Sequence, residues 1–192
     1  MVGFNRRFSS LIYDLKNLLN KKNERKSFIY TCNAGFISED HWIQNPKIGG
    51  GRLIGEACHF VDLLFYLSGS KIKSLEVNYM LENIKRQDTF SINLTFVDGS
   101  IGTIHYFANG NNSFPKERIE VFCGGSIFRL DNFKKLTAWG VHNYNKRRLL
   151  IQDKGLTNCV NAFIDSIKNN NQSPIEFNDL IHVHEKILEA KQ

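Results

Sequence analysis

Hydrophobic and polar residues alternate through the middle of the chain, which is the period of a β-strand with one buried face. From residue 71 to about residue 140, the alternating segments lie near positions 72–79, 90–96, 101–107, 119–123, 127–130 and 136–139. Asp98-Gly99 and Gly124-Gly125 separate neighbouring segments, and such pairs are typical of hairpin turns. The pattern predicts an open, mostly antiparallel sheet of about six strands.

Apolar residues at helical spacing flank this region on both sides. Ser9 or Ser10 can cap a helix that runs to about residue 19. After the sheet, the spacing predicts a helix over residues 158–168 and a final helix from about residue 178. The first of these should bury Val160, Phe163, Ile164 and Ile167. We therefore expect an α+β fold with helices on one face of the sheet.

A further helix carries the most distinctive polar residues of the chain. Glycines at 49–51 precede a segment in which Arg52, Glu56, His59 and Asp62 share one side. Asp62 follows His59 by three residues, a spacing at which a carboxylate can fix the imidazole tautomer and raise its basicity. This arrangement is expected of a general acid or base that acts on a hydroxyl or carbonyl group. A solvated polar face held by ordinary ion pairs is the alternative.

The run GGGRLIGEACHFVDLLFYLSG resembles the signature of the substrate-side domain of the Gfo/Idh/MocA family, the NAD(P)-dependent sugar and polyol dehydrogenases. In that family a glycine-rich turn leads into a helix of the form Asp-x-x-x-His-x-x-Asp. His59 and Asp62 match the His and the final Asp, whereas Gly55 stands where the first Asp would be. Whether the neighbouring Glu56 replaces that carboxylate is left open by the sequence.

The resemblance also implies a division of the chain. Residues 1–8 would be a remnant of the last strand of a nucleotide-binding domain, and residues 9–192 would be the substrate-binding and oligomerisation domain. His59 would relay the proton of the reacting hydroxyl, and Asp62 would orient it. The residues that would grip other hydroxyls or an acidic group of a sugar or nucleotide-linked sugar are Asn33, Lys47, Arg52 and Glu56.

Two features of a complete enzyme are absent from these residues. No Gly-x-Gly-x-x-Gly follows a strand, so nothing here cradles a pyrophosphate in the usual way. The Glu-Lys-Pro segment, whose lysine is the family's leading acid/base, is also absent. We expect NAD or NADP to be the cofactor of the full-length enzyme. The missing N-terminal domain would bind this cofactor and would be a partner of the present chain. The chain alone should be inactive and should bind neither cofactor tightly.

The second face of the predicted sheet implies a further partner. Phe, Tyr and Ile occur on both alternating sets, so one face would leave a large apolar patch in water. We expect a homodimer or tetramer that associates through the sheet, as the family resemblance also implies.

Composition bears on the cellular location, on metal binding and on the alternative functions of the chain. No run of about 18 apolar residues and no export signal is present, and four widely spaced cysteines suggest reduced thiols, so a cytoplasmic location is expected. No Cys-x-x-Cys pair or other metal site is predicted. The net charge of +6 raises the alternative of a nucleic-acid-binding domain, but the basic clusters are interrupted and favour a solvated surface. A stand-alone, non-catalytic sugar-binding or assembly module is the second alternative.

Overall fold

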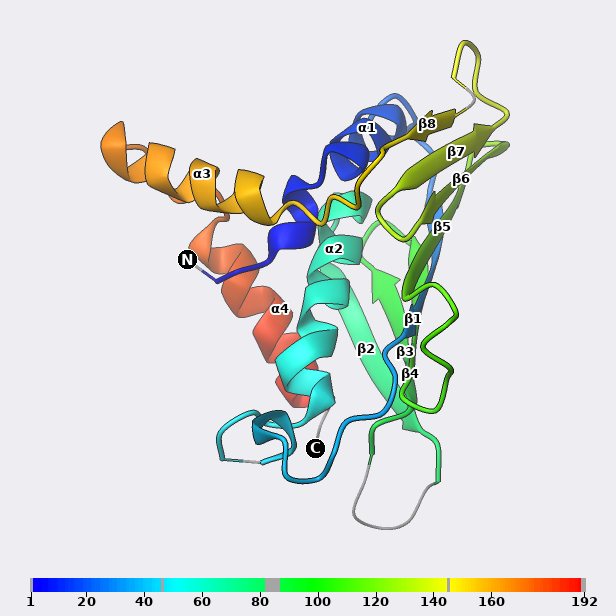
Figure 1. Ribbon diagram of the computed structural model, residues 1–192. Coiled ribbons are helices and arrows are strands. Elements are labelled where there is room, and N and C mark those ends of the chain that lie inside the picture. The colour runs from blue at the N-terminus through cyan, green and yellow to red at the C-terminus, as the bar shows by residue number, and fades with distance from the viewer. Residues whose placement is uncertain (1, 46, 82–86, 145, 191–192) are drawn as a thin grey trace.

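The protein forms one sheet covered by helices on one face (Figure 1). The computed structural model describes residues 2–45, 47–81, 87–144 and 146–190. The strands are β1 (Lys26–Asn33), β2 (Ile72–Tyr79), β3 (Phe90–Phe96), β4 (Ile101–Phe107), β5 (Glu117–Cys123), β6 (Ser126–Asp131), β7 (Lys135–Trp139) and β8 (Lys146–Arg148). The helices are α1 (Ser10–Leu19), α2 (Cys58–Ser68), α3 (Leu156–Lys168) and α4 (Phe177–Glu189).

The α+β class and the mostly antiparallel sheet are confirmed, but the predicted number of strands was too low. The sheet has eight strands in the order β2-β3-β4-β1-β5-β6-β7-β8, and only β1 and β4 pair in parallel among the described residues. The predicted sheet did not include β1, because local alternation does not show which strands pair. β8 was missed since its three residues are exposed and basic and show no apolar alternation.

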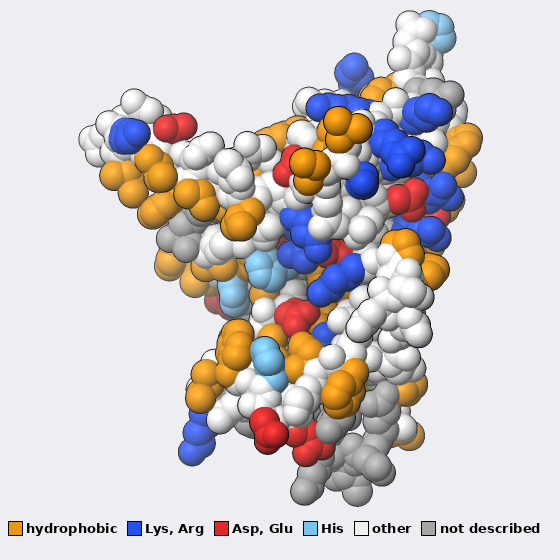
Figure 2. All heavy atoms as spheres, viewed as in Figure 1, with side chains coloured by type: hydrophobic (Ala, Val, Ile, Leu, Met, Phe, Trp, Pro, Cys, Tyr) orange, Lys and Arg blue, Asp and Glu red, His pale blue; other side chains and the backbone are white. Residues whose placement is uncertain are grey.

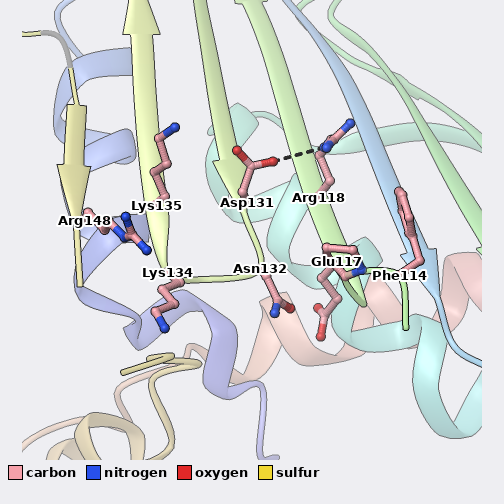
Figure 3. A pocket seen from close by; sticks show the side chains of 9 residues that line it. Phe114, Glu117, Arg118, Asp131, Asn132, Lys134, Lys135 and Arg148 are labelled. Atoms are coloured by element: carbon pink, nitrogen blue, oxygen red, sulfur yellow. Dashed lines mark hydrogen bonds and ion pairs between the residues drawn. The ribbon is translucent and has the colours of Figure 1, made fainter. Parts of the chain in front are cut away.

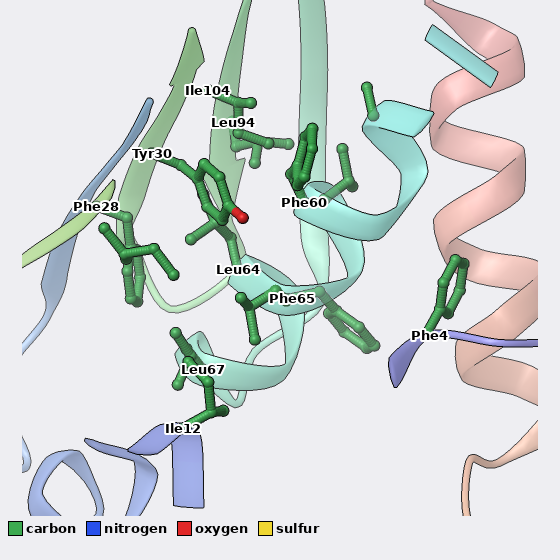
Figure 4. Close-up of a cluster of buried hydrophobic side chains, with 14 of the residues drawn as sticks. Phe4, Ile12, Phe28, Tyr30, Phe60, Leu64, Phe65, Leu67, Leu94 and Ile104 are labelled. Carbon is green, nitrogen blue, oxygen red and sulfur yellow. The ribbon is translucent and has the colours of Figure 1, made fainter. Parts of the chain in front are cut away.

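The core lies between the sheet and α2. Phe60 and Leu64 of α2 face Tyr30 and Ile104 of the sheet (Figure 4), and these four side chains are fully or almost fully buried. Burial of large side chains against one sheet face is the main source of stability in such a two-layer fold. The core therefore fixes α2, and with it His59, against the sheet.

The helix after the sheet forms as predicted but exposes the face that was expected to be buried. Val160, Phe163, Ile164 and Ile167 of α3 are all exposed, and Ile167 is 64% accessible. The spacing of apolar residues identifies which side of a helix is apolar, but not what covers it. Figure 1 shows α3 extending away from the sheet, which explains why its apolar side is left open.

The N-terminal segment differs from the strand that the family resemblance implies. Asn5–Phe8 forms a 3-10 helix, and residue 1 lies outside the described residues. Phe4 and Phe8 are buried, so this segment belongs to the core of the fold. Whether residues 1–8 are a remnant of another domain stays a prediction.

Two further features of the described residues concern membrane-spanning helices and cysteines. No described helix has the length and apolar character needed to cross a bilayer. The four cysteines are buried and unpaired, as their spacing predicted.

Candidate functional site

The turn that precedes α2 is shaped by glycines. Leu53–Ala57 forms a π-helical turn directly before His59, rather than a regular helical start. A Cβ at Gly49 would lie 2.3 Å from the backbone of Ile43, so no larger residue fits there. A Cβ at Gly55 would meet the Ile43 side chain at 3.0 Å, so Ile43 fills the space that the family's first Asp would need.

His59 lies near the start of α2 and is half-buried. Its Nδ1 is covered and has no hydrogen-bond partner, and no described residue bonds its other ring nitrogen. The ring of Phe4 meets it edge-on at 5.5 Å between centroids. Burial, together with the positive charge of Arg6, lowers the pKa of His59 to about 4, although Glu117 and Glu56 act in the opposite direction. The imidazole is therefore neutral near pH 7, whereas acidic neighbours were expected to raise its basicity.

The carboxylate of Asp62 pairs with Arg7, and Nδ1 of His59 has no hydrogen-bond partner, so the predicted pairing of the two residues is wrong. The two carboxylate oxygens of Asp62 accept hydrogen bonds of 2.8 and 2.6 Å from Nε and Nη2 of Arg7. Burial raises the pKa of Asp62 to about 6, against the effect of the Arg7 bonds. A spacing of three residues allows His59 and Asp62 to meet on a helix. The guanidinium of Arg7 is the preferred partner of the carboxylate, because it donates two hydrogen bonds at once. In this structure Asp62 anchors the N-terminal segment to α2.

Glu117 is the centre of a polar cluster that the sequence analysis missed. Its carboxylate, fully buried at the start of β5, accepts bonds of 2.9 and 3.2 Å from Nε and Nη2 of Arg6. The hydroxyl of Tyr30 and the ammonium of Lys154 also donate to it. Burial alone would raise the pKa of Glu117, but the charges and bonds of Arg6 and Lys154 outweigh it and lower the pKa to about 2.

A sequence signal for Glu117 did exist. The inward-facing residues of β5 are Ile119, Val121 and Cys123, and the same alternation extended by two positions reaches Glu117. A carboxylate on the buried face of a strand needs charged partners, so it marks a functional or structural cluster.

Arg52 and Glu56 belong to a second chain of polar contacts. Arg52 is 2% exposed and donates from Nε to the Tyr106 hydroxyl at 2.6 Å and from Nη1 to the Gly35 carbonyl at 3.0 Å. The Tyr106 hydroxyl in turn donates to Glu56 at 2.5 Å. Nη2 of Arg52 is buried without a partner. The structure therefore brings two of the four predicted substrate-binding residues together.

The other two predicted substrate-binding residues have different surroundings. Nδ2 of Asn33 donates to the backbone carbonyls of Asn111 and Phe114, at 2.7 and 3.3 Å, so Asn33 holds the loop before β5. Lys47 is exposed, and its side chain makes no hydrogen bond or ion pair with any described residue. A role for either residue in binding substrate stays a prediction.

Charged side chains gather in a hollow on one face of the molecule. Figure 2 shows basic, acidic and histidine side chains close together in the indented middle of this face, below α3. The charges of Arg6, Glu117 and Glu56 all act on the pKa of His59. A neutral imidazole among fixed charges can accept or pass on the proton of a bound hydroxyl.

The described residues do not fit a dinucleotide. The one parallel pair, β1 and β4, is joined through α2, β2 and β3, and the glycines before α2 lead into a π-helical turn with a buried Arg52. A dinucleotide site instead needs a strand that passes through a glycine-rich turn directly into a helix. No part of NAD(P) binding is therefore assigned to this chain.

An open sheet with helices on one face, beside a hollow that gathers charged and histidine side chains, defines an α+β domain. Residues 27–127 match the family model described as the GFO/IDH/MocA C-terminal domain. The match spans more than half of the chain, so the chain belongs to the Gfo/Idh/MocA family of oxidoreductases. No curated protein matches the chain.

Solved structures agree on the fold. The chain is similar to the dehydrogenase MviM from Clostridium difficile, with 22% identity and a TM-score of 0.75 over 98% of this chain and 60% of that chain. It is also similar to the UDP-N-acetylglucosamine 3-dehydrogenase GnnA from Acidithiobacillus ferrooxidans, with 16% identity, a TM-score of 0.78 and 98% and 59% coverage. A third is the aldose-aldose oxidoreductase from Caulobacter crescentus, with 16% identity, a TM-score of 0.79 and 99% and 61% coverage. The chain thus spans about 60% of the length of these proteins.

Proposed function

We propose that this chain is the substrate-binding and oligomerisation domain of an NAD(P)-dependent sugar or polyol dehydrogenase. His59 carries the proposal, because its neutral ring makes no hydrogen bond with any described residue and is influenced by the charges of Arg6, Glu117 and Glu56. A buried nitrogen without a partner is costly in a folded protein and is often explained by a ligand. The printed names of similar structures, a UDP-sugar dehydrogenase and an aldose oxidoreductase, support a sugar as the substrate.

In this proposal the chain's residues act on the substrate alone. His59 holds the hydroxyl that reacts and receives or returns its proton, and Glu117 with Arg6 fixes the local charge. Arg52 and Glu56 bind further hydroxyls from the other polar chain. NAD or NADP would supply the redox chemistry from a separate nucleotide-binding domain.

The uncovered side of α3 supports a second domain. Ile164 and Ile167 are exposed together with Phe177 and Ile181 of α4, and the N-terminal end of the described chain lies beside these helices (Figure 1). Such an apolar surface needs a partner. A nucleotide-binding domain covering it would form the other wall of the hollow around His59.

The outer sheet face supports association between copies. Phe122, Ile127 and Trp139 are exposed and lie in register on β5, β6 and β7. Ile101 of β4 is exposed at the corresponding end of its strand. We propose that this patch joins copies of the chain.

Calorimetric titration of the chain with a panel of aldoses, polyols and nucleotide-linked sugars tests the proposed substrate role. We expect at least one of them to bind, and expect His59→Gln to weaken its binding roughly tenfold, as for the loss of one good hydrogen bond. His142→Gln is the matched control, because His142 is exposed in a loop after β7. Absence of binding by the whole panel, or equal effects of the two substitutions, would refute the proposal.

A further inference from the structure

A pocket of about 450 Å³ opens at one edge of the sheet, where β5 and β7 begin and β6 and β8 end (Figure 3). Its lining includes Arg118 and Asp131, which lie opposite each other on β5 and β6, and Lys135 and Arg148, which continue the same row onto β7 and β8. Glu117 also lines it, so the pocket adjoins the cluster near His59.

The pocket carries positive charge that the protein does not neutralise. Its acidic residues are already paired, since Asp131 is 3.1 Å from both Arg118 and Arg129, and Glu117 is held by Arg6 and Lys154. Lys134, Lys135 and Arg148 form no ion pair with any residue in the described ranges. Figure 2 shows lysine and arginine side chains gathered over β7 and β8. Three free cations around one pocket favour an anionic ligand.

The turn that presents this charge is strained and firmly held. Asn132 and Phe133 have φ angles of +49° and +51°, and the Lys134 amide donates to the Asp131 carbonyl at 3.0 Å. Glycine or asparagine is usual at such positions, and a phenylalanine there costs free energy. Phe133 is 1% exposed, so its burial in the core offsets the cost. The strained backbone fixes Asn132 and Lys134 at the strand ends, where Figure 3 shows their side chains pointing to the same side.

Two further groups indicate what the anion is attached to. Oδ1 of Asn132 is buried without a hydrogen-bond partner, so it can accept from a ligand hydroxyl. Phe114 offers an exposed ring on the rim, on which a base or the apolar face of a sugar can stack. A ligand that satisfies all three features carries a phosphate, a hydroxyl and a flat face.

We propose that this pocket binds the phosphate of a phosphorylated or nucleotide-linked sugar, with the anion on Lys134 and Arg148 and a sugar hydroxyl on Asn132. The choice of a sugar rests on the proposed function, whereas the choice of an anion rests on the pocket. The apolar residues Phe122, Ile127 and Trp139 lie toward the opposite ends of their strands, so that patch and the pocket are separate surfaces.

Calorimetric titrations of the chain with glucose 1-phosphate, UDP-glucose and glucose test the site. We expect both phosphorylated probes to bind at least roughly tenfold more tightly than glucose, because each charged hydrogen bond contributes more than a neutral one. Binding should weaken with added salt, since the pocket is open to solvent. Tighter binding of UDP-glucose would identify a nucleotide-linked sugar as the source, and equal binding would identify a simple sugar phosphate.

The variants separate this site from a general effect of basic charge. Lys134→Ala and Arg148→Ala should each weaken binding of glucose 1-phosphate roughly tenfold, and Lys134→Arg should retain it. Lys168→Ala at the exposed end of α3 is the matched control and should have no effect. The site is refuted if neither phosphorylated probe binds, or if Lys134→Ala and Arg148→Ala have no more effect than Lys168→Ala.

The two proposals can fail separately. If His59→Gln weakens sugar binding while Lys134→Ala does not, the phosphate pocket is wrong and the substrate role of the hollow stands. If Lys134→Ala weakens phosphate binding while His59→Gln has no effect on any sugar, the pocket stands and the proposed function fails.

Discussion

Single residues decide the chemistry of the hollow, and His59 is the clearest case. Its pKa of about 4 lies below the ordinary value of 6.5, because the folded protein buries the ring near Arg6. The folded state therefore binds a proton less readily than the unfolded chain. This contribution to stability is present above pH 6.5 and is lost as the pH falls through 4.

Urea unfolding between pH 7 and pH 4 measures this effect. Over this window the contribution of His59 should be lost, whereas Asp62, with its pKa raised to about 6, gains stability as the pH falls. The free energy of unfolding of the wild-type chain should therefore fall relative to that of His59→Gln, in which only the Asp62 effect remains. The same slope in both proteins would show that the imidazole is not shielded as described. Glu117 acts in a lower window, since its stabilising effect is lost between pH 4.5 and 2.

Removal of the Glu117 carboxylate should be severe. Glu117→Ala leaves Arg6 and Lys154 without their shared partner, and loss of one member of a buried ion pair costs about 3–5 kcal/mol. Glu120→Ala, on the opposite face of the same strand, should change the free energy of unfolding by less than about 0.5 kcal/mol. Equal losses for the two variants, measured by urea titration, would contradict the role of Glu117 as the centre of the cluster.

Partners at the residue scale were hard to predict from the sequence. The spacing correctly placed Glu56 and Arg52 near one another, since Nε of Arg52 lies 3.8 Å from Oε1 of Glu56. It gave the wrong partner for Asp62, because Arg7 lies 55 residues away and no local pattern reports it. Contacts between distant segments depend on how the whole core packs, and the spacing of residues within one helix carries no information about that packing.

The helices and strands could be predicted from the sequence more completely than the side-chain partners. Alternation located β2 to β7, glycine-containing pairs located two turns, and helical spacing located α1, because all of these depend on neighbouring residues. It missed β8 and the place of β1 in the sheet, which depend on long-range pairing. The exposed side of α3 shows the same limit, since amphipathicity does not reveal the covering partner.

That exposed side provides a test at the element scale. Ile167→Ser on α3 should leave the free energy of unfolding of this chain almost unchanged, because the side chain is 64% exposed. Ile187→Ser on α4 should be strongly destabilising, by about 3 kcal/mol or more, because Ile187 is 1% exposed and a hydroxyl would be buried among apolar groups. A large loss for Ile167→Ser would mean that this face is already covered in solution.

For the whole molecule, association through the outer sheet face is the proposal to test. Light scattering at micromolar concentration should show a dimer or tetramer, and Trp139→Glu should shift it toward monomer by placing a charge in the apolar patch. Val97→Glu, at the exposed β3–β4 turn, is a control for added charge. A purely monomeric wild-type chain would exclude this mode of association.

His59 is proposed to contact the substrate. Histidine-selective 15N NMR during titration with the tightest-binding sugar of the panel tests it most directly, because the imidazole nitrogens report both protonation and hydrogen bonding. We expect His59 to be neutral at pH 7 and to titrate near pH 4. Its resonances should move on sugar binding, while those of His142 should not. A His59 ring that titrates near pH 6.5, or that is unchanged when the sugar saturates the protein, would contradict this proposal.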